Sequence, residues 1–168
     1  MNAQVWQPYQ LRQKAIDAAA AINYSREDFL RAEQDLAARG GGAPDPGEVF
    51  WSLANRALSE AGAQGNWERL HDVYVDQARW LHEEGRRSPY TLLRDASIAL
   101  LRDCATRWGM QAKVQVLACD DGAVCAVCAS NRGKTWTVAE ALENPPVPHP
   151  DCANGFCRCR LGLVVLEP

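Results

Sequence analysis

The chain has 168 residues, a length that suits one domain or one domain with a small appendage. Its 47% hydrophobic and 23% charged residues are ordinary for a globular protein, and its net charge of −3 gives no basic excess that would favour nucleic acid or an anionic membrane surface. No stretch approaches the roughly 20 apolar residues that span a bilayer, so no membrane partner is expected.

The first residues, Met1 to Gln7, lack the basic start and the apolar run of a signal peptide. We therefore expect a cytoplasmic protein. In such a reducing compartment, clustered cysteines serve as metal ligands more often than as disulfide partners.

The N-terminal part, residues 1–43, is predicted to be a helical arm. Residues 10–22 carry an alanine run with high helix propensity. Ser25 stands where the N-cap of a second helix belongs, and that helix should continue to Arg39. The glycine run 40–42 then ends it and separates the arm from the rest of the chain.

A helical body is predicted over residues 44–110. Apolar residues recur at helical spacing in three segments, and each segment begins at a capping signal and ends near a glycine. The start signals are Asp45-Pro46, Asn66 and Ser88-Pro89, and the glycines are Gly62, Gly85 and Gly109.

The pattern changes in residues 111–168. Residues 113–118 alternate with period two, as a half-buried strand does, and residues 134–138 and 161–166 offer two further short strands. A short helix is expected over 139–143. The predicted fold is therefore mostly α, a helical body with a small C-terminal α+β module that resembles a treble clef.

Seven cysteines are unusual for a chain of this length, and six of them lie in its last 50 residues. Two of them, one in a predicted helix and one at the end of a predicted strand, are expected to be small buried hydrophobic residues. The seven are Cys104, Cys119, Cys125, Cys128, Cys152, Cys157 and Cys159.

The Cys-x-x-Cys pair at Cys125 and Cys128 predicts half of a tetrahedral zinc shell, because a tight knuckle brings two thiolates to one side. The other half must come from residues 149–159, which offer several donors together. The six candidate ligands, in order of preference, are Cys125, Cys128, Cys157, Cys152, Cys159 and His149. The sequence leaves open which four of these bind.

A structural zinc ion is favoured over a catalytic one. The thiolates are numerous enough to close the metal shell, whereas a catalytic site keeps an open position and a nearby acid or base. Glu140 and Glu143 are the acids most like a general base, but neither belongs to a metal-site motif. We therefore assign no catalytic residue.

The cysteine-rich segment resembles the C-terminal motif of the phage Mu F-like minor head proteins, the phage head morphogenesis family. In that family a Cys-x-x-Cys pair is followed by a glycine, by Pro-Pro and by His-Pro-x-Cys-Arg-Cys. The matching residues here are Cys125, Cys128, Gly133, Pro145, Pro146, His149, Pro150, Cys152, Cys157, Arg158 and Cys159. This chain departs from the pattern by inserting residues 153–156 before Cys157, so the ligand set cannot be copied directly.

The resemblance implies a virion or prophage-derived protein that contacts the portal or the head interior, and a bacterial protein that has borrowed the module is equally consistent with it. The first hypothesis is therefore a non-enzymatic structural or interaction protein with a protein partner and a structural Zn²⁺. A nucleic-acid-binding zinc protein is the second, although residues 120–168 hold four basic residues against six acidic ones. The third is a metal-dependent nuclease or other hydrolase, which would need an open metal position beside His149.

Overall fold

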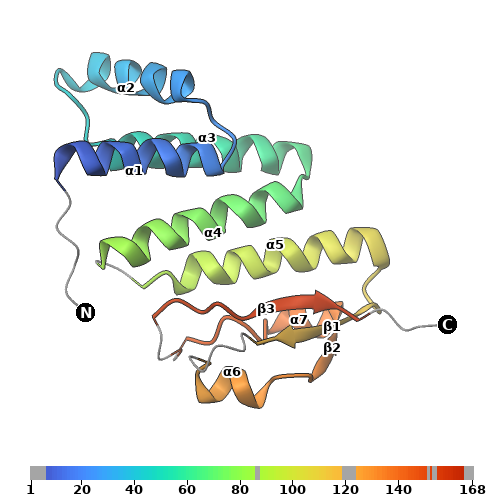
Figure 1. Cartoon of the computed structure of the whole chain (residues 1–168). Coiled ribbons are helices and arrows are strands. Elements are labelled where there is room, and N and C mark those ends of the chain that lie inside the picture. The colour runs from blue at the N-terminus through green and yellow to red at the C-terminus, as the bar shows by residue number, and fades with distance from the viewer. Residues whose placement is uncertain (1–6, 86–87, 119–123, 151, 153–154, 165–168) are drawn as a thin grey trace.

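The computed structural model describes residues 7–85, 88–118, 124–150, 152 and 155–164. Five long helices are stacked in layers, and a small three-stranded sheet lies at the end of the stack farthest from α2 (Figure 1). The prediction of a mostly helical chain with strands near the C-terminus is confirmed. The elements are α1 (Pro8–Ala21), α2 (Arg26–Gly40), α3 (Pro46–Gln64), α4 (Trp67–Glu84), α5 (Tyr90–Trp108), β1 (Lys113–Leu117), α6 (Ala126–Ser130), β2 (Thr135–Thr137), α7 (Val138–Glu143) and β3 (Arg160–Leu163).

The predicted caps start the helices as expected. The Ser25 hydroxyl accepts a hydrogen bond from the Asp28 amide at 3.1 Å, and the Asp45 carboxylate accepts one from the Gly47 amide at 2.8 Å. The Asn66 side chain accepts one from the amide of Arg69 at 3.0 Å. Each bond satisfies an amide that has no partner within its helix.

The predicted end of α3 at Gly62 was two residues early. The helix continues to Gln64, and Gly65 takes the left-handed conformation at φ +63° that closes it. A left-handed residue is the usual stop for a helix, and glycine adopts it without a steric penalty. Gly62 has helical geometry and simply forms part of the last turns.

The N-terminal helices share one hydrophobic core with α3 and α4. Phe29 of α2 and Phe50 of α3 are fully buried, and Phe50 stacks on Trp80 of α4 with ring centroids 4.8 Å apart. The predicted arm therefore packs onto the body, while the division of the chain at residue 43 stays a prediction. Other members of this core are Ala15, Ile16, Ile22, Leu53 and Val73.

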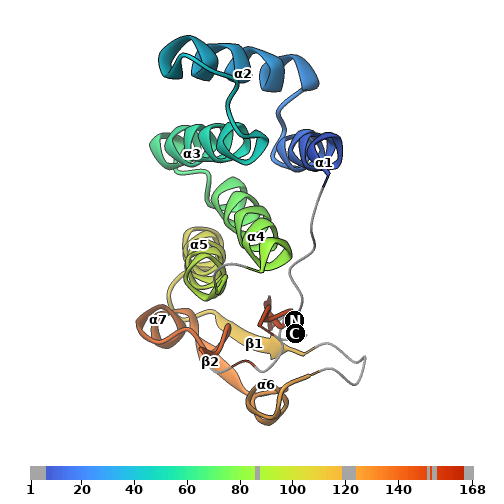
Figure 2. The ribbon, with the colours of Figure 1, turned by 90° about the vertical axis from the view of Figure 1, so that its left-hand side faces the viewer.

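The sheet has the strand order β2-β1-β3, and both pairs are antiparallel. Its central strand buries Val114 and Val116, each 1% exposed, while Lys113 and Leu117 face outward. These valines belong to a second core that includes Leu101 of α5. The module therefore covers the last long helix, as Figure 2 shows from the side.

The strands are shorter than predicted. β2 ends at Thr137 because that residue becomes the N-cap of α7, with its hydroxyl accepting from the Glu140 amide at 3.2 Å. β3 begins one residue early, at Arg160, and the predicted residues 165 and 166 lie outside the described part of the chain. Over the described residues, no helix combines the length and apolarity needed to cross a bilayer.

Candidate metal centre

Two segments far apart in sequence bring five cysteines together beside the sheet. Cys125 and Cys128 come from the start of α6, and the others come from the irregular segment that leads into β3. We call this set the cysteine cluster: Cys125, Cys128, Cys152, Cys157 and Cys159.

The knuckle at Cys125 is built by local backbone geometry. Cys125 is the extended N-cap of α6, and its Sγ accepts a hydrogen bond from the Cys128 amide at 3.4 Å. This bond turns both sulfur atoms to the same side, as the Cys-x-x-Cys spacing predicts. The cluster thus begins from a preformed pair.

The thiols form two overlapping groups of three. Cys125, Cys128 and Cys152 make one, and Cys128, Cys157 and Cys159 make the other; within each, all Sγ atoms lie within 4.8 Å of one another. Cys128 belongs to both groups and is the centre of the cluster.

The sulfur spacing fits a tetrahedral metal shell. The Sγ atoms of Cys128 and Cys157 are 3.7 Å apart. Four sulfur ligands at Zn–S bonds of about 2.3 Å place neighbouring sulfur atoms about 3.8 Å apart. The two segments therefore already hold one thiol from each side at ligand spacing, and clustered cysteines of this kind could bind a metal ion.

The thiols of the cluster differ in the direction of their pKa shifts. Burial raises the pKa of the Cys157 thiol to about 11, and burial together with the neighbouring Cys125 raises the pKa of the Cys128 thiol far above its ordinary value. The amide of Cys128 lowers the pKa of the Cys125 thiol. Without a cation the buried pair keeps its protons, so metal binding must release them.

His149 is the one residue other than cysteine among the six predicted ligands. Its half-buried imidazole belongs to neither three-donor group of the described chain, while its carbonyl accepts a hydrogen bond from the Cys152 amide at 3.1 Å. This hydrogen bond helps to hold the backbone at Cys152. Its role as a metal ligand stays a prediction.

Helix α6 was not among the elements predicted from the sequence. Cysteine is outside the usual set of N-cap residues, so the sequence carried no start signal there. The helix has only five residues, ending at Ser130, and a turn follows it.

The two remaining cysteines have separate outcomes. Cys104 is half-buried on α5 and packs against the second core, and burial raises the pKa of its thiol. This is the packing role expected of it. Cys119 lies outside the described residues.

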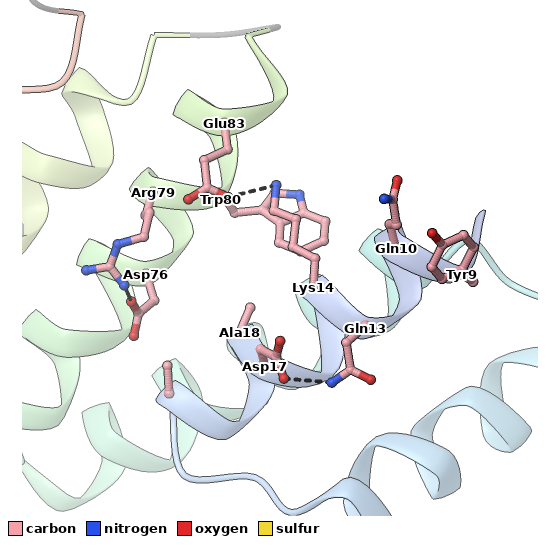
Figure 3. Close-up of a pocket in the computed structure, with 11 residues that line it drawn as sticks. Tyr9, Gln10, Gln13, Lys14, Asp17, Ala18, Asp76, Arg79, Trp80 and Glu83 are labelled. Carbon is pink, nitrogen blue, oxygen red and sulfur yellow. Dashed lines mark hydrogen bonds and ion pairs between the residues drawn. The ribbon is translucent and has the colours of Figure 1, made fainter. Parts of the chain in front are cut away.

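A groove with a volume of about 760 Å³ lies between α1 and α4 (Figure 3). Its charged groups are engaged with their neighbours. Lys14 lies 4.2 Å from the centroid of the Trp80 ring and 3.1 Å from the Glu83 carboxylate, and Asp76 forms an ion pair with Arg79. The groove therefore lies where α1 packs against α4, and its charged side chains already take part in contacts there.

Comparisons with protein-family models, with curated protein sequences and with solved structures gave no match. The function of the site therefore has to be inferred from its own geometry.

Glu140, one of the two acids considered as a general base, has a structural role. Its carboxylate accepts a hydrogen bond from the Thr137 amide at 2.8 Å and so caps α7.

Proposed function

We propose that the cysteine cluster binds one structural zinc ion and that the protein is a non-enzymatic interaction protein. The observation that carries the metal assignment is the meeting of two cysteine segments at Cys128, with a sulfur–sulfur distance of 3.7 Å to Cys157. Thiolates held this close together would repel one another unless a cation joined them, and a bound metal ion supplies that charge.

Zinc is favoured by the donor atoms. Thiolates are soft ligands that select zinc, copper(I) or iron–sulfur clusters, whereas calcium and magnesium require oxygen donors. Zinc accepts tetrahedral sulfur ligands without a redox change and closes small modules of this size. The knuckle at α6, the strand and helix between the two cysteine segments, and the return at Cys157 support a treble-clef-like arrangement.

An interaction role, with a protein partner, follows from a closed metal shell and from the resemblance to phage head morphogenesis proteins. Four thiolates leave no position for a substrate or for an activated water molecule. We propose that the chain is derived from a prophage or virion and contacts other head proteins. Particles released from a lysogen that carries the gene should then contain the chain by mass spectrometry, and particles that lack it would contradict the head role.

The metal proposal is tested by elemental mass spectrometry on protein purified without chelators. The wild type should hold about one zinc per chain. Cys128→Ser removes the thiol common to both groups and should abolish binding. Cys104→Ser is the matched control, because it removes a half-buried thiol outside the cluster and should leave zinc content unchanged. A metal-free wild type, or equal loss in both variants, would refute the site.

A further inference from the structure

The cysteine cluster holds one thiol more than a tetrahedral zinc shell uses. Cys125, Cys128 and Cys152 form one complete three-thiol group, and Cys157, which is buried and 3.7 Å from Cys128, supplies the fourth sulfur from the other group. Cys159 is then the thiol that stays beside the metal without binding it.

Solvent access distinguishes Cys159 from its neighbour in the same group. Both Cys157 and Cys159 line a cavity of about 590 Å³ between the helical stack and the cysteine module, but Cys157 is only 6% exposed and Cys159 is half-buried. Leu117 lines the same cavity and is 48% exposed, so the cavity is open to solvent. Hydrogen peroxide is little larger than water and can therefore reach the Cys159 sulfur.

Cys159 also has a second thiol within reach for a disulfide. Its sulfur lies within 4.8 Å of the sulfur atoms of Cys128 and Cys157. Cys157 is two residues away along the chain, and in an extended chain the Cα atoms of such residues are about 6.6 Å apart, close to the upper limit for a disulfide. Cys128 comes from the other segment, so rotation of the two side chains can close the gap without straining a short loop.

We propose that Cys159 is an oxidation site through which a hydroperoxide releases the zinc ion. Redox-sensitive cysteines combine solvent access with a neighbouring thiol that resolves the oxidised sulfur, and Cys159 has both. The inference rests on the proposed function, because Cys128, the thiol that resolves Cys159, is there a zinc ligand.

The reaction has two balanced steps. The Cys159 sulfur attacks one oxygen of hydrogen peroxide, the O–O bond breaks, and the thiol proton leaves with the other oxygen as water, which gives a sulfenic acid. The Cys128 thiolate then attacks the Cys159 sulfur, the S–O bond breaks, and hydroxide leaves. The two sulfur atoms together supply the two electrons that reduce the peroxide, and zinc stays divalent throughout.

The disulfide removes Cys128 from the metal shell and consumes the thiol that could have replaced it. Three cysteines then remain for four positions, and zinc leaves. Because Cys128 belongs to the second core, this release loosens the sheet and leaves the first core intact. A dithiol reductant reverses the step by thiol–disulfide exchange and is itself oxidised to a disulfide.

The test follows zinc release from the zinc-loaded full chain in hydrogen peroxide, with a colorimetric zinc chelator as the readout. The wild type should release its zinc, and a dithiol reductant added after removal of peroxide should restore binding. Cys159→Ser should hold zinc before treatment and release it at least about tenfold more slowly, because only zinc-bound thiolates remain in the cluster. Cys104→Ser is the matched control, since it removes a half-buried thiol outside the cluster and should release zinc at the wild-type rate.

Peptide mapping of the oxidised wild type identifies the bond independently of any variant. Trypsin cleaves after Arg158 and so separates Cys159 from Cys157 in the digest. The expected product is a disulfide between Cys128 and Cys159. A brief exposure to peroxide with dimedone present should also label Cys159, because dimedone traps the sulfenic acid formed in the first step.

Zinc content is measured for every protein before treatment. A wild type without zinc refutes the proposed metal site, whereas a zinc-loaded wild type that releases metal no faster than Cys159→Ser refutes only the oxidation site. Loss of zinc from untreated Cys159→Ser would make Cys159 a ligand and overturn the proposal. A disulfide that joins Cys104 or Cys119 in place of Cys159 would overturn it as well.

Discussion

Cys128 is the residue on which the site depends. It is 1% exposed and belongs to both three-thiol groups, and its backbone amide donates a hydrogen bond to the Cys125 sulfur. The other cysteines of the cluster differ in how they are held in place and in how deeply they are buried. Cys125 is fixed by its own helix cap, whereas Cys152 and Cys159 are half-buried members of one group each.

Five thiols for four ligand positions predict redundancy at the half-buried cysteines. A tetrahedral shell leaves one sulfur unused, so a remaining thiol should replace either Cys152 or Cys159. We expect Cys152→Ser and Cys159→Ser each to keep about one zinc, and the double variant to keep much less. Elemental analysis of the three proteins decides this, and full zinc loss in one single variant would identify an obligatory ligand.

Asp76 gives a prediction about pH. Its carboxylate side chain is only 12% exposed, and burial raises its pKa despite the Arg79 ion pair. The folded protein therefore holds this proton more tightly than the unfolded chain does. The associated stability is present below the unfolded pKa near 3.8 and is lost as the pH rises through the higher folded value.

Asp76→Asn should accordingly raise the free energy of unfolding at pH 7, and the gain should shrink toward zero below about pH 4. Urea denaturation at pH 7 and pH 3.5 measures both. A destabilised variant at pH 7 would mean that the ion pair with Arg79 outweighs the burial of the charge.

At the scale of single elements, capping hydrogen bonds fix the residues at which the long helices begin. The Ser25 cap is reciprocal, since the Asp28 carboxylate also accepts from the Ser25 amide at 3.0 Å. Ser25→Ala should cost about 1 kcal/mol of unfolding free energy. Ser59→Ala, at an exposed position inside α3, is the matched control and should be close to neutral. Equal effects in urea titrations would show that the cap contributes nothing.

The short elements around the cluster depend on tertiary contacts rather than on their own caps. β2 has three residues and α6 has five, lengths that are unstable alone in water. They are held by β1, by the second core and, in our proposal, by the metal. This dependence explains why their bounds were harder to predict than those of the five long helices.

The whole molecule has two main cores with different expected responses to metal removal. The first joins α1 to α4 and contains Phe29 and Phe50, and the second joins α5 to the sheet and contains Val114 and Val116. Cys128 and Cys157 are members of the second core alone. The first core should therefore not depend on the metal.

Treatment with a strong chelator should abolish amide hydrogen-exchange protection in β1 and β3 and leave it in α1 to α3. Structural metals supply folding free energy to the part of the chain that they close. Exchange followed by mass spectrometry distinguishes the regions, and adding zinc back should restore protection. Uniform loss across both cores, or no loss in the strands, would contradict this separation.

The amino-acid sequence by itself determined the local features. Ser25, Asp45 and Asn66 marked the helix starts because capping depends on a bond to an amide two or three residues away. The knuckle at Cys125 and the alternation at 113–117 were visible for the same reason. The end of α3 was not, since two glycines were available and only Gly65 takes the left-handed conformation.

Only the tertiary structure decided which distant groups meet. It placed Cys152, Cys157 and Cys159 around Cys128, left the His149 imidazole out of both thiol groups and lined a cavity with Arg158 and Arg160. These placements depend on how the sheet packs on α5, which involves contacts between residues far apart in the chain. Local propensities cannot specify such contacts, because the free energy that selects them comes from burying the shared core.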